Sequence, residues 1–166
     1  MSVAKADPRN DPWNKIMLAP ADYLRALNDS GVTFFTGVPD SLLKEFCACV
    51  TAVMKQQDHV IAANEGASVG LAIGHYIGTG SLPLVYLQNS GLGNTVNPLL
   101  SLASPEVYGI PMLVMLGWRG EPGTADEPQH IKQGLITENL LKTMDVNYHI
   151  LSKSITKSKL EEIINA

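Results

Sequence analysis

The residue whose chemistry stands out in this sequence is Glu65. Residues 59–118 carry only two charged side chains, Glu65 and Glu106. The immediate neighbours of Glu65 are small and apolar, so its carboxylate can lie in a partly dry setting that suits the uptake and release of a proton. A plainer interpretation stays open. Glu65 stands where a helix is expected to begin, and the helix dipole stabilises an acidic side chain there by about 0.3–1 kcal/mol.

A glycine-rich turn, Asn89-Ser-Gly-Leu-Gly-Asn94, is a second candidate. It follows an apolar run that predicts a strand, and backbone N–H groups at a strand-to-helix turn can bind an anion. Neither a Lys-Ser nor a Lys-Thr pair follows the glycines, so the turn is not a phosphate-binding loop of that type. A tight turn without a ligand is the alternative.

A polar loop after the most apolar strand is the third candidate. It contains Trp118-Arg-Gly-Glu-Pro-Gly123 and Asp126-Glu-Pro-Gln-His130. Arg119 could hold an anionic substrate with its fork of N–H donors, and His130 could relay protons near neutral pH. The loop could equally be a solvated connector with local ion pairs.

Alternating strands and helices must position these residues. Apolar runs predict strands, and apolar stripes at spacings of three and four predict helices between them. This order indicates a three-layer α/β/α fold with a mostly parallel sheet of about five to six strands. Ligands in such folds bind at the loops that follow the strands, here 37–40, 64–66, 89–94 and 117–130. The predicted strands are 32–36, 59–63, 84–88, 112–116 and 148–151; the predicted helices are 20–28, 42–54, 65–79, 96–103, 136–144 and 157–165.

The helix predicted to begin at Glu65 has a glycine at every fourth position, from Gly66 through Gly70 and Gly74 to Gly78. Each glycine costs about 0.5–1 kcal/mol relative to alanine in a helix, so the stripe indicates the close approach of another backbone. Two partners are open: the sheet of the same chain, or a second subunit.

Composition limits the classes of protein. The chain has 166 residues, a net charge of −4 and two cysteines. This length predicts one domain, over residues 16–166, preceded by a polar tail over 1–15. The chain ends abruptly after its last helix, so we expect either a truncated domain or a single-domain subunit. The acidic balance argues against nucleic acid, the apolar runs are too short to span a membrane, and the cysteine content predicts a reducing, cytoplasmic location.

Taken together, the loops resemble those of thiamine-diphosphate-dependent decarboxylases, and among them phosphonopyruvate decarboxylase. The similarity spans residues 18–151, which corresponds to the N-terminal pyrimidine-binding domain of that family. Sulfopyruvate decarboxylase shares the block 88–94 and is more distant elsewhere. The blocks that carry the resemblance are Gly37-Val-Pro-Asp-Ser-Leu-Leu-Lys44, Ala62-Ala-Asn-Glu-Gly-Ala67, Gln88-Asn-Ser-Gly-Leu-Gly-Asn94, Gly117-Trp-Arg-Gly-Glu-Pro-Gly123 and Asp126-Glu-Pro-Gln-His130.

The resemblance implies a role for several residues. Glu65 matches the glutamate that hydrogen-bonds the aminopyrimidine ring nitrogen of thiamine diphosphate, and it is expected to be catalytic together with His130. Arg119, Asn89 and His130 are expected at the substrate, and no residue of this chain is expected to bind a metal. The residues expected to border the cofactor besides Glu65 are Gly37, Val38, Pro39, Asp40, Asn89, Ser90 and Gly91.

One motif of the family is absent. The Gly-Asp-Gly motif, through which the family binds the diphosphate and Mg²⁺, does not occur in this chain. The resemblance therefore implies half of a cofactor site, completed by a diphosphate-binding domain or subunit that supplies the Mg²⁺ ligands, in a homo- or hetero-oligomer. The implied reaction converts 3-phosphonopyruvate to phosphonoacetaldehyde and CO2, and we expect no turnover by the chain alone. The alternatives are a sulfopyruvate decarboxylase alpha-type subunit and a non-catalytic orphan or dimerisation domain.

Overall fold

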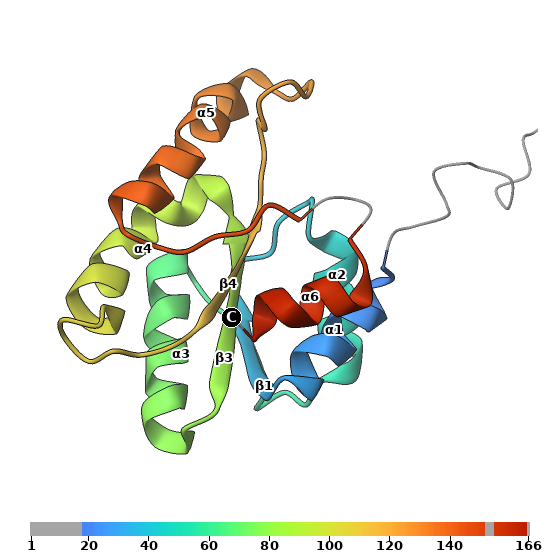
Figure 1. Ribbon diagram of the computed structural model, residues 1–166, viewed down its shortest axis with the longest axis vertical. Helices are drawn as coiled ribbons and strands as arrows, with labels where there is room; N and C mark the ends of the chain where they lie inside the picture. Colours follow the sequence, from blue (N-terminus) through green and yellow to red (C-terminus); the bar gives the residue numbers. More distant parts are fainter. Residues whose placement is uncertain (1–17, 152–154, 166) are drawn as a thin grey trace, which may run out of the picture.

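A parallel sheet forms the centre of the molecule (Figure 1). The computed structural model describes residues 18–151 and 155–165, so the tail predicted over residues 1–15 lies outside the described residues. Each strand follows a helical connection that returns the chain to the same edge of the sheet, which makes all the pairings parallel. The strand order is β2-β1-β3-β4, with β1 (Val32–Gly37), β2 (His59–Ile61), β3 (Leu82–Gln88) and β4 (Leu113–Gly117).

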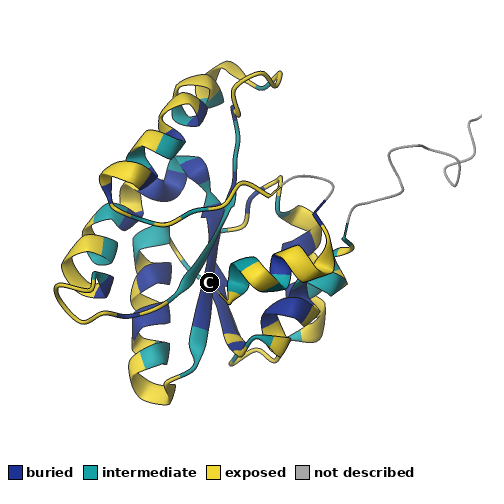
Figure 2. Ribbon diagram, in the orientation of Figure 1, coloured by how far each residue is buried: buried dark blue, intermediate teal, exposed yellow. Residues whose placement is uncertain are grey.

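Helices cover both faces of the sheet, which confirms the three-layer α/β/α prediction (Figures 1 and 2). Alternate side chains of β3 show the two faces: Leu84 and Tyr86 pack with α1 and α2, whereas Val85 and Leu87 pack with α3. All four are fully buried, as expected for a central parallel strand. One layer contains α1 (Pro20–Asp29), α2 (Lys44–Val53) and α6 (Lys157–Ile164); the other contains α3 (Glu65–Thr79) and α4 (Leu92–Pro98).

The start of α3 is set by a side-chain cap. Asn64 Oδ1 accepts a hydrogen bond from the backbone N–H of Ala67 at 2.9 Å, and asparagine is a favoured residue at this capping position. The helix ends at Gly80, whose φ of 71° lies in the left-handed region that favours glycine. Because only Ala62 and Ala63 separate the end of β2 from the cap, Glu65 is held at the carboxyl edge of the sheet.

The predicted fifth strand over residues 148–151 is wrong. The segment has no ladder with the sheet, and in Figure 1 it crosses the sheet rather than running along it. The hydroxyl of Tyr148 donates to Glu138 Oε1 at 2.6 Å, and its ring packs beside Leu141 and Met144. These contacts tie the segment to the preceding helix, so the described sheet has four strands instead of five or six.

Two other predicted elements begin or end elsewhere. The helix predicted over 136–144 is α5 (Pro128–Thr143), which begins two turns earlier because Pro128 is well suited to the first helical position. The helix predicted over 96–103 begins earlier, at residue 89, and the helical segment has three parts: a 3-10 turn η3 (Asn89–Gly91), α4, and a wider π turn η4 (Leu99–Ala103). The wide turn follows Pro98, which has no N–H for a regular helical hydrogen bond.

The glycine stripe of α3 meets two different surroundings. A Cβ added to Gly66 would lie 2.8 Å from the carbonyl oxygen of Asn94, so Gly66 allows α4 to approach closely. A Cβ at Gly70, Gly74 or Gly78 would meet nothing within 4 Å. Internal packing therefore explains the first glycine alone, and the sheet of the same chain is not the reason for the other three.

Candidate functional site

The candidate residues come from loops that meet at one edge of the sheet. Gly37 at the end of β1 is in register with Ile61 of β2 and with Tyr86 of β3, and Gln88 is in register with Gly117 of β4. The four predicted loops therefore leave the sheet side by side. This places Glu65, the turn 89–94 and the loop after β4 around one edge, where ligands of parallel α/β sheets bind.

The Glu65 carboxylate is fixed by one contact and open at its other oxygen. Asn94 Nδ2 donates to Glu65 Oε2 at 2.7 Å. Glu65 Oε1 accepts no hydrogen bond from any residue that the structure describes, and the side chain is only half buried. The backbone of Glu65 is held as well, because Ser68 Oγ donates to its carbonyl oxygen at 2.6 Å. The arrangement leaves one oriented carboxylate oxygen for a ligand.

Gly91 makes room for this carboxylate. A Cβ on Gly91 would overlap Glu65 Oε1 and would lie 2.5 Å and 2.6 Å from its Cδ and Cγ atoms. Gly91 has φ −80° and ψ −8°, which any residue can adopt, so its backbone does not require glycine. The space occupied by the Glu65 side chain is the reason that position 91 has no side chain.

Asn89 is buried and joins three segments. Its Nδ2 donates to the carbonyl oxygen of Arg119 and to Thr137 Oγ1, both at 2.9 Å, and its Oδ1 accepts from the Arg119 N–H at 3.1 Å. These bonds hold the loop after β4 and helix α5 against the end of β3. The predicted contact of Asn89 with cofactor or substrate stays a prediction, and the side-chain amide is already engaged within the chain.

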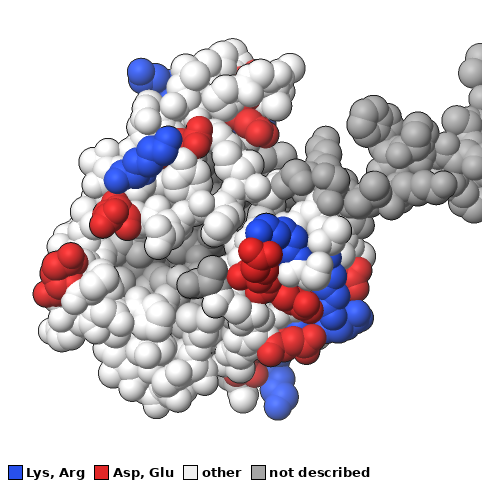
Figure 3. Space-filling view, in the orientation of Figure 1, with Lys and Arg blue, Asp and Glu red and all other residues white. Residues whose placement is uncertain are grey.

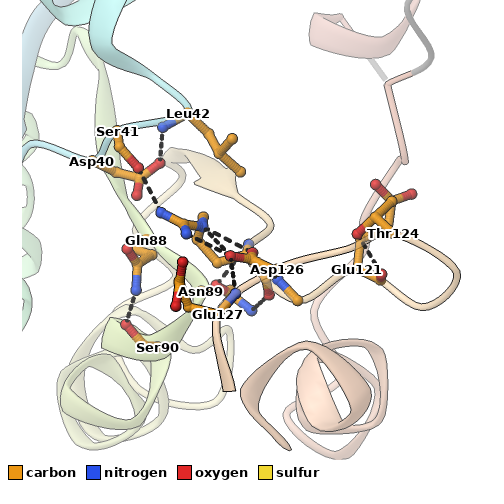
Figure 4. Close-up of polar contacts among 12 residues, drawn as sticks. Asp40, Ser41, Leu42, Gln88, Asn89, Ser90, Glu121, Thr124, Asp126 and Glu127 are labelled. Atoms are coloured by element: carbon orange, nitrogen blue, oxygen red, sulfur yellow. Dashed lines mark hydrogen bonds and ion pairs between the residues drawn. The ribbon is translucent and has the colours of Figure 1, made fainter. Parts of the chain in front are cut away.

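Arg119 is paired within its own loop by Asp126. Asp126 and Ser41, the two side chains that accept hydrogen bonds from Arg119, are labelled in Figure 4. Its Nε donates to Asp126 Oδ2 at 2.9 Å, and its Nη1 donates to Ser41 Oγ at 2.8 Å. Asp126 Oδ2 also accepts from the Gly120 N–H at 2.7 Å. The hydrogen bonds from Arg119 hold the pKa of the Asp126 carboxyl well below its usual range, and the same bonds raise the pKa of Arg119. The structure supports the local ion-pair alternative for this loop, and the substrate contact of Arg119 stays a prediction.

Asp126→Asn is expected to reduce stability at neutral pH and to change the response to acid. A lowered pKa in the folded state means that the ion pair stabilises the protein fully above the ordinary aspartate value of about 4, and that this stabilisation is lost as the pH falls below it. Urea unfolding of both proteins from about pH 7 to pH 3 tests this. The difference in unfolding free energy between the wild type and Asp126→Asn should become smaller below about pH 4. Glu45→Gln, at an exposed and loosely paired position, is the control. An equal difference at every pH would contradict the expectation.

Asp40 combines burial with an unsatisfied oxygen. Its Oδ2 accepts the N–H of Leu42 at 2.8 Å, whereas its buried Oδ1 has no hydrogen-bond partner among the described residues. A Cβ on Gly117 would overlap Oδ2, so glycine at the end of β4 lets the aspartate approach. In the same loop Val38 is half buried and Pro39 is exposed. The loop 37–40 lies at the predicted edge, and its cofactor contacts stay a prediction.

The last two predicted residues, His130 and Ser90, form no hydrogen bond with Glu65. His130 lies in the first turn of α5 instead of a loop, and its side chain forms no hydrogen bond or ion pair with any described residue. The hydroxyl of Ser90 accepts from Gln88 Nε2 at 2.5 Å. The predicted catalytic role of His130 and the cofactor contact of Ser90 therefore stay predictions. Among the described residues there is no group of three or more His, Cys, Asp or Glu side chains that could hold a metal ion.

The structure adds two residues that the sequence prediction missed. Asn94 contacts the carboxylate of Glu65, and Asp126 holds Arg119. The sequence carried no specific signal for Asn94, because the predicted turn 89–94 ends at this residue and the predicted helix begins only at residue 96. Asp126 carried none either, since its pairing depends on how the loop folds back.

Within the described residues, no helix is long and apolar enough to cross a lipid bilayer.

Comparison with known proteins identifies relatives of this domain. Residues 21–141 match the family model described as thiamine pyrophosphate enzyme, N-terminal TPP binding domain. Phosphonopyruvate decarboxylase of Streptomyces viridochromogenes is 38% identical over 135 residues, which are 81% of this chain and 33% of that protein. Sulfopyruvate decarboxylase subunit alpha of Methanococcus maripaludis is 36% identical over 124 residues, 75% of this chain and 71% of that subunit.

A solved structure supports the fold. A protein from Mycobacterium smegmatis that is described as a thiamin diphosphate-dependent enzyme superposes with a TM-score of 0.50 at 20% identity. The match covers 61% of this chain and 19% of that one. The chain thus spans about a third of the phosphonopyruvate decarboxylase that it matches, and less of this solved structure.

Proposed function

The chain belongs to the family of thiamine pyrophosphate enzyme N-terminal TPP binding domains, and from this membership we propose that it forms the pyrimidine-binding half of a thiamine-diphosphate-dependent 2-oxo-acid decarboxylase. The observation that supports the proposal is the Glu65 carboxylate at the carboxyl edge of the sheet. One of its oxygens is fixed by Asn94, and the other, which lies beside Gly91, is left for a ligand.

In this proposal the residues of the chain bind and orient the cofactor. Glu65 holds a proton shared with the ring nitrogen of the aminopyrimidine, and the loop 37–40 and the turn 89–91 border that ring. When bound, thiamine diphosphate supplies the electron sink that a departing CO2 requires. Arg119 and His130 lie toward the substrate, with Arg119 kept in place by Asp126. Mg²⁺ would be held by the diphosphate-binding half, not by this chain.

The proposed substrate is a 2-oxo acid with an anionic tail. Phosphonopyruvate, which would give phosphonoacetaldehyde and CO2, is supported by the 38% identity with phosphonopyruvate decarboxylase. Sulfopyruvate is the second candidate, because the chain covers 71% of a sulfopyruvate decarboxylase alpha subunit at 36% identity. We would compare kcat/KM for the two acids with the complete enzyme. A preference of at least about tenfold for phosphonopyruvate is expected, and the reverse preference would assign the second substrate.

The proposal includes a partner, because the chain would hold only half of the cofactor site. A cytoplasmic location stays a prediction, which rests on the low cysteine content. We expect the purified chain to produce no CO2 from either acid with thiamine diphosphate and Mg²⁺, and to become active when a diphosphate-binding half is added. Turnover by the chain alone would contradict the two-part site. A complete enzyme without activity on any 2-oxo acid would favour the non-catalytic alternative.

The exposed face of α3 is the proposed surface for association. Gly70 and Gly74 lie beside Leu71 and Ile77, whose side chains are 40% and 67% exposed. No residue from Gly66 to Pro105 is charged. In Figure 3 a broad part of the visible face is free of charged side chains. A helix face with glycines and apolar side chains, and with no charge, suits close packing against another subunit.

Gly74→Leu should weaken association without weakening the fold. A leucine at this open helical position has space and a better helix propensity, by about 0.8 kcal/mol, so the unfolding temperature should stay or rise. In the complete enzyme the same side chain would prevent close approach, and sedimentation velocity should show dissociated species. Ala48→Leu, exposed on α2, is the matched control. Unchanged association for Gly74→Leu would remove α3 from the interface.

A further inference from the structure

Asn94 is the residue whose side chain bonds the Glu65 carboxylate. The two residues come from different helices, α4 and α3, and their contact at 2.7 Å is a hydrogen bond from an amide donor to a carboxylate oxygen. Hydrogen bonds of this charged kind are shorter and stronger than neutral ones. A glutamate without such a bond would sample several side-chain rotamers, since its side chain is long and only half buried.

Two glycines bring the helices close enough for this bond. Gly66, the neighbour of Glu65, leaves room for the carbonyl oxygen of Asn94, which would lie 2.8 Å from a Cβ at that position. Gly91 leaves room for the carboxylate itself, which a Cβ there would overlap. The helices α4 and α3 are therefore in close contact at this point, and the Asn94 side chain connects them by its hydrogen bond to Glu65. Its backbone and its amide both take part in the contact.

The bond makes the two oxygens of Glu65 different. Oε2 is occupied by Asn94, so Oε1, which lies against Gly91, is the oxygen available to a ligand. We propose that Asn94 is a positioning residue, which holds Glu65 in the rotamer that presents Oε1 to the pyrimidine ring. This inference rests on the proposed function. A group fixed in advance loses less freedom when the cofactor binds and reacts.

A purely structural role for Asn94 predicts a lower unfolding temperature when its side chain is removed. Asn94 is exposed, and its side chain contacts no other described residue through a hydrogen bond. Removing it should therefore change the unfolding temperature little. If Asn94 acts through Glu65, its removal should lower kcat and weaken cofactor binding, and KM for the 2-oxo acid should stay nearly constant.

The test uses the complete enzyme with three variants. Asn94→Ala is expected to lower kcat by about tenfold and to raise the thiamine diphosphate Kd, measured by calorimetry, by about three- to tenfold, in line with the loss of one charged hydrogen bond. Asn94→Asp, which replaces the donor by a second carboxylate of the same shape, should lower kcat further. Asn97→Ala is the matched control on the same helix, since Asn97 is exposed and, within the described part of the chain, its side chain bonds only Ser101.

A double-variant cycle separates the inference from the proposed function. If Asn94 acts through Glu65, Asn94→Ala should have less than about a twofold additional effect on cofactor affinity in a Glu65→Ala background, where the side chain that Asn94 bonds is absent. If Glu65→Gln keeps full activity, the proposed function itself fails. If Glu65→Gln is inactive while Asn94→Ala and Asn94→Asp keep kcat and Kd within twofold of the wild type, only the positioning role is overturned.

Discussion

Glu65→Gln in the complete enzyme should lower kcat by at least about 100-fold, because a glutamine cannot exchange the proton that the proposed chemistry requires at the pyrimidine ring. Removing one acid–base group of an enzyme typically costs about 10²–10⁴ in rate. The change keeps the size of the side chain and a polar atom for Asn94, so the fold should be unaffected. Steady-state decarboxylation, with circular dichroism to check folding, measures the effect.

Glu106→Gln is the matched control for this prediction. Glu106 is the other charged residue in the stretch 59–118, and it is exposed on the loop that leads to β4. Its replacement should leave kcat within about twofold of the wild-type value. Equal kcat values for Glu65→Gln and the wild type would show that the Glu65 carboxylate only stabilises the start of α3.

Gly91→Ala is expected to have the second largest effect, a loss of about 10- to 100-fold in kcat with little loss of stability. The backbone of Gly91 suits alanine, so the strain falls on the Glu65 side chain, whose carboxylate atoms lie nearest to the new methyl group. A long side chain can rotate away, whereas the packed turn cannot. Displacement of a reacting group by about 1 Å can cost about 100-fold in rate. Activity and thermal unfolding, measured together, test this.

Gly93→Ala provides a control two residues away. A Cβ on Gly93 would meet nothing within 4 Å, and the residue is exposed on α4. Its replacement should leave kcat unchanged and should stabilise the helix slightly. Two outcomes would contradict the account of position 91: full activity in Gly91→Ala, or a loss of activity that is matched by unfolding.

The layers of the fold could be predicted because local patterns and burial agree. The apolar runs near 32–37, 82–88 and 113–117 are strands that lie between helices on both sides, and long apolar runs between turn residues predict this. The segment 148–151 was mispredicted because its residues suit a strand equally well. What decides its path is the hydroxyl bond from Tyr148 to Glu138, a tertiary contact that no local pattern contains.

The candidate site was predictable in part for the same reason. Glu65 was visible because a charge is rare in an otherwise uncharged stretch. The pairing of Arg119 with Asp126 was not visible as a specific contact, since a loop of polar residues allows many pairings. The glycine stripe correctly indicated the close approach of another backbone at Gly66. It did not show that Gly70, Gly74 and Gly78 face open space, because glycines with and without a neighbour follow the same four-residue spacing.

We propose that Glu65 acts on the pyrimidine ring of bound thiamine diphosphate. This role can be followed through the rate at which the bound cofactor exchanges its C2 proton for deuterium, measured by proton NMR after rapid quenching, in the wild-type complete enzyme and in Glu65→Gln. We expect an exchange rate at least about 100-fold lower in Glu65→Gln at saturating cofactor. Equal exchange rates in the two cofactor-saturated proteins would contradict it.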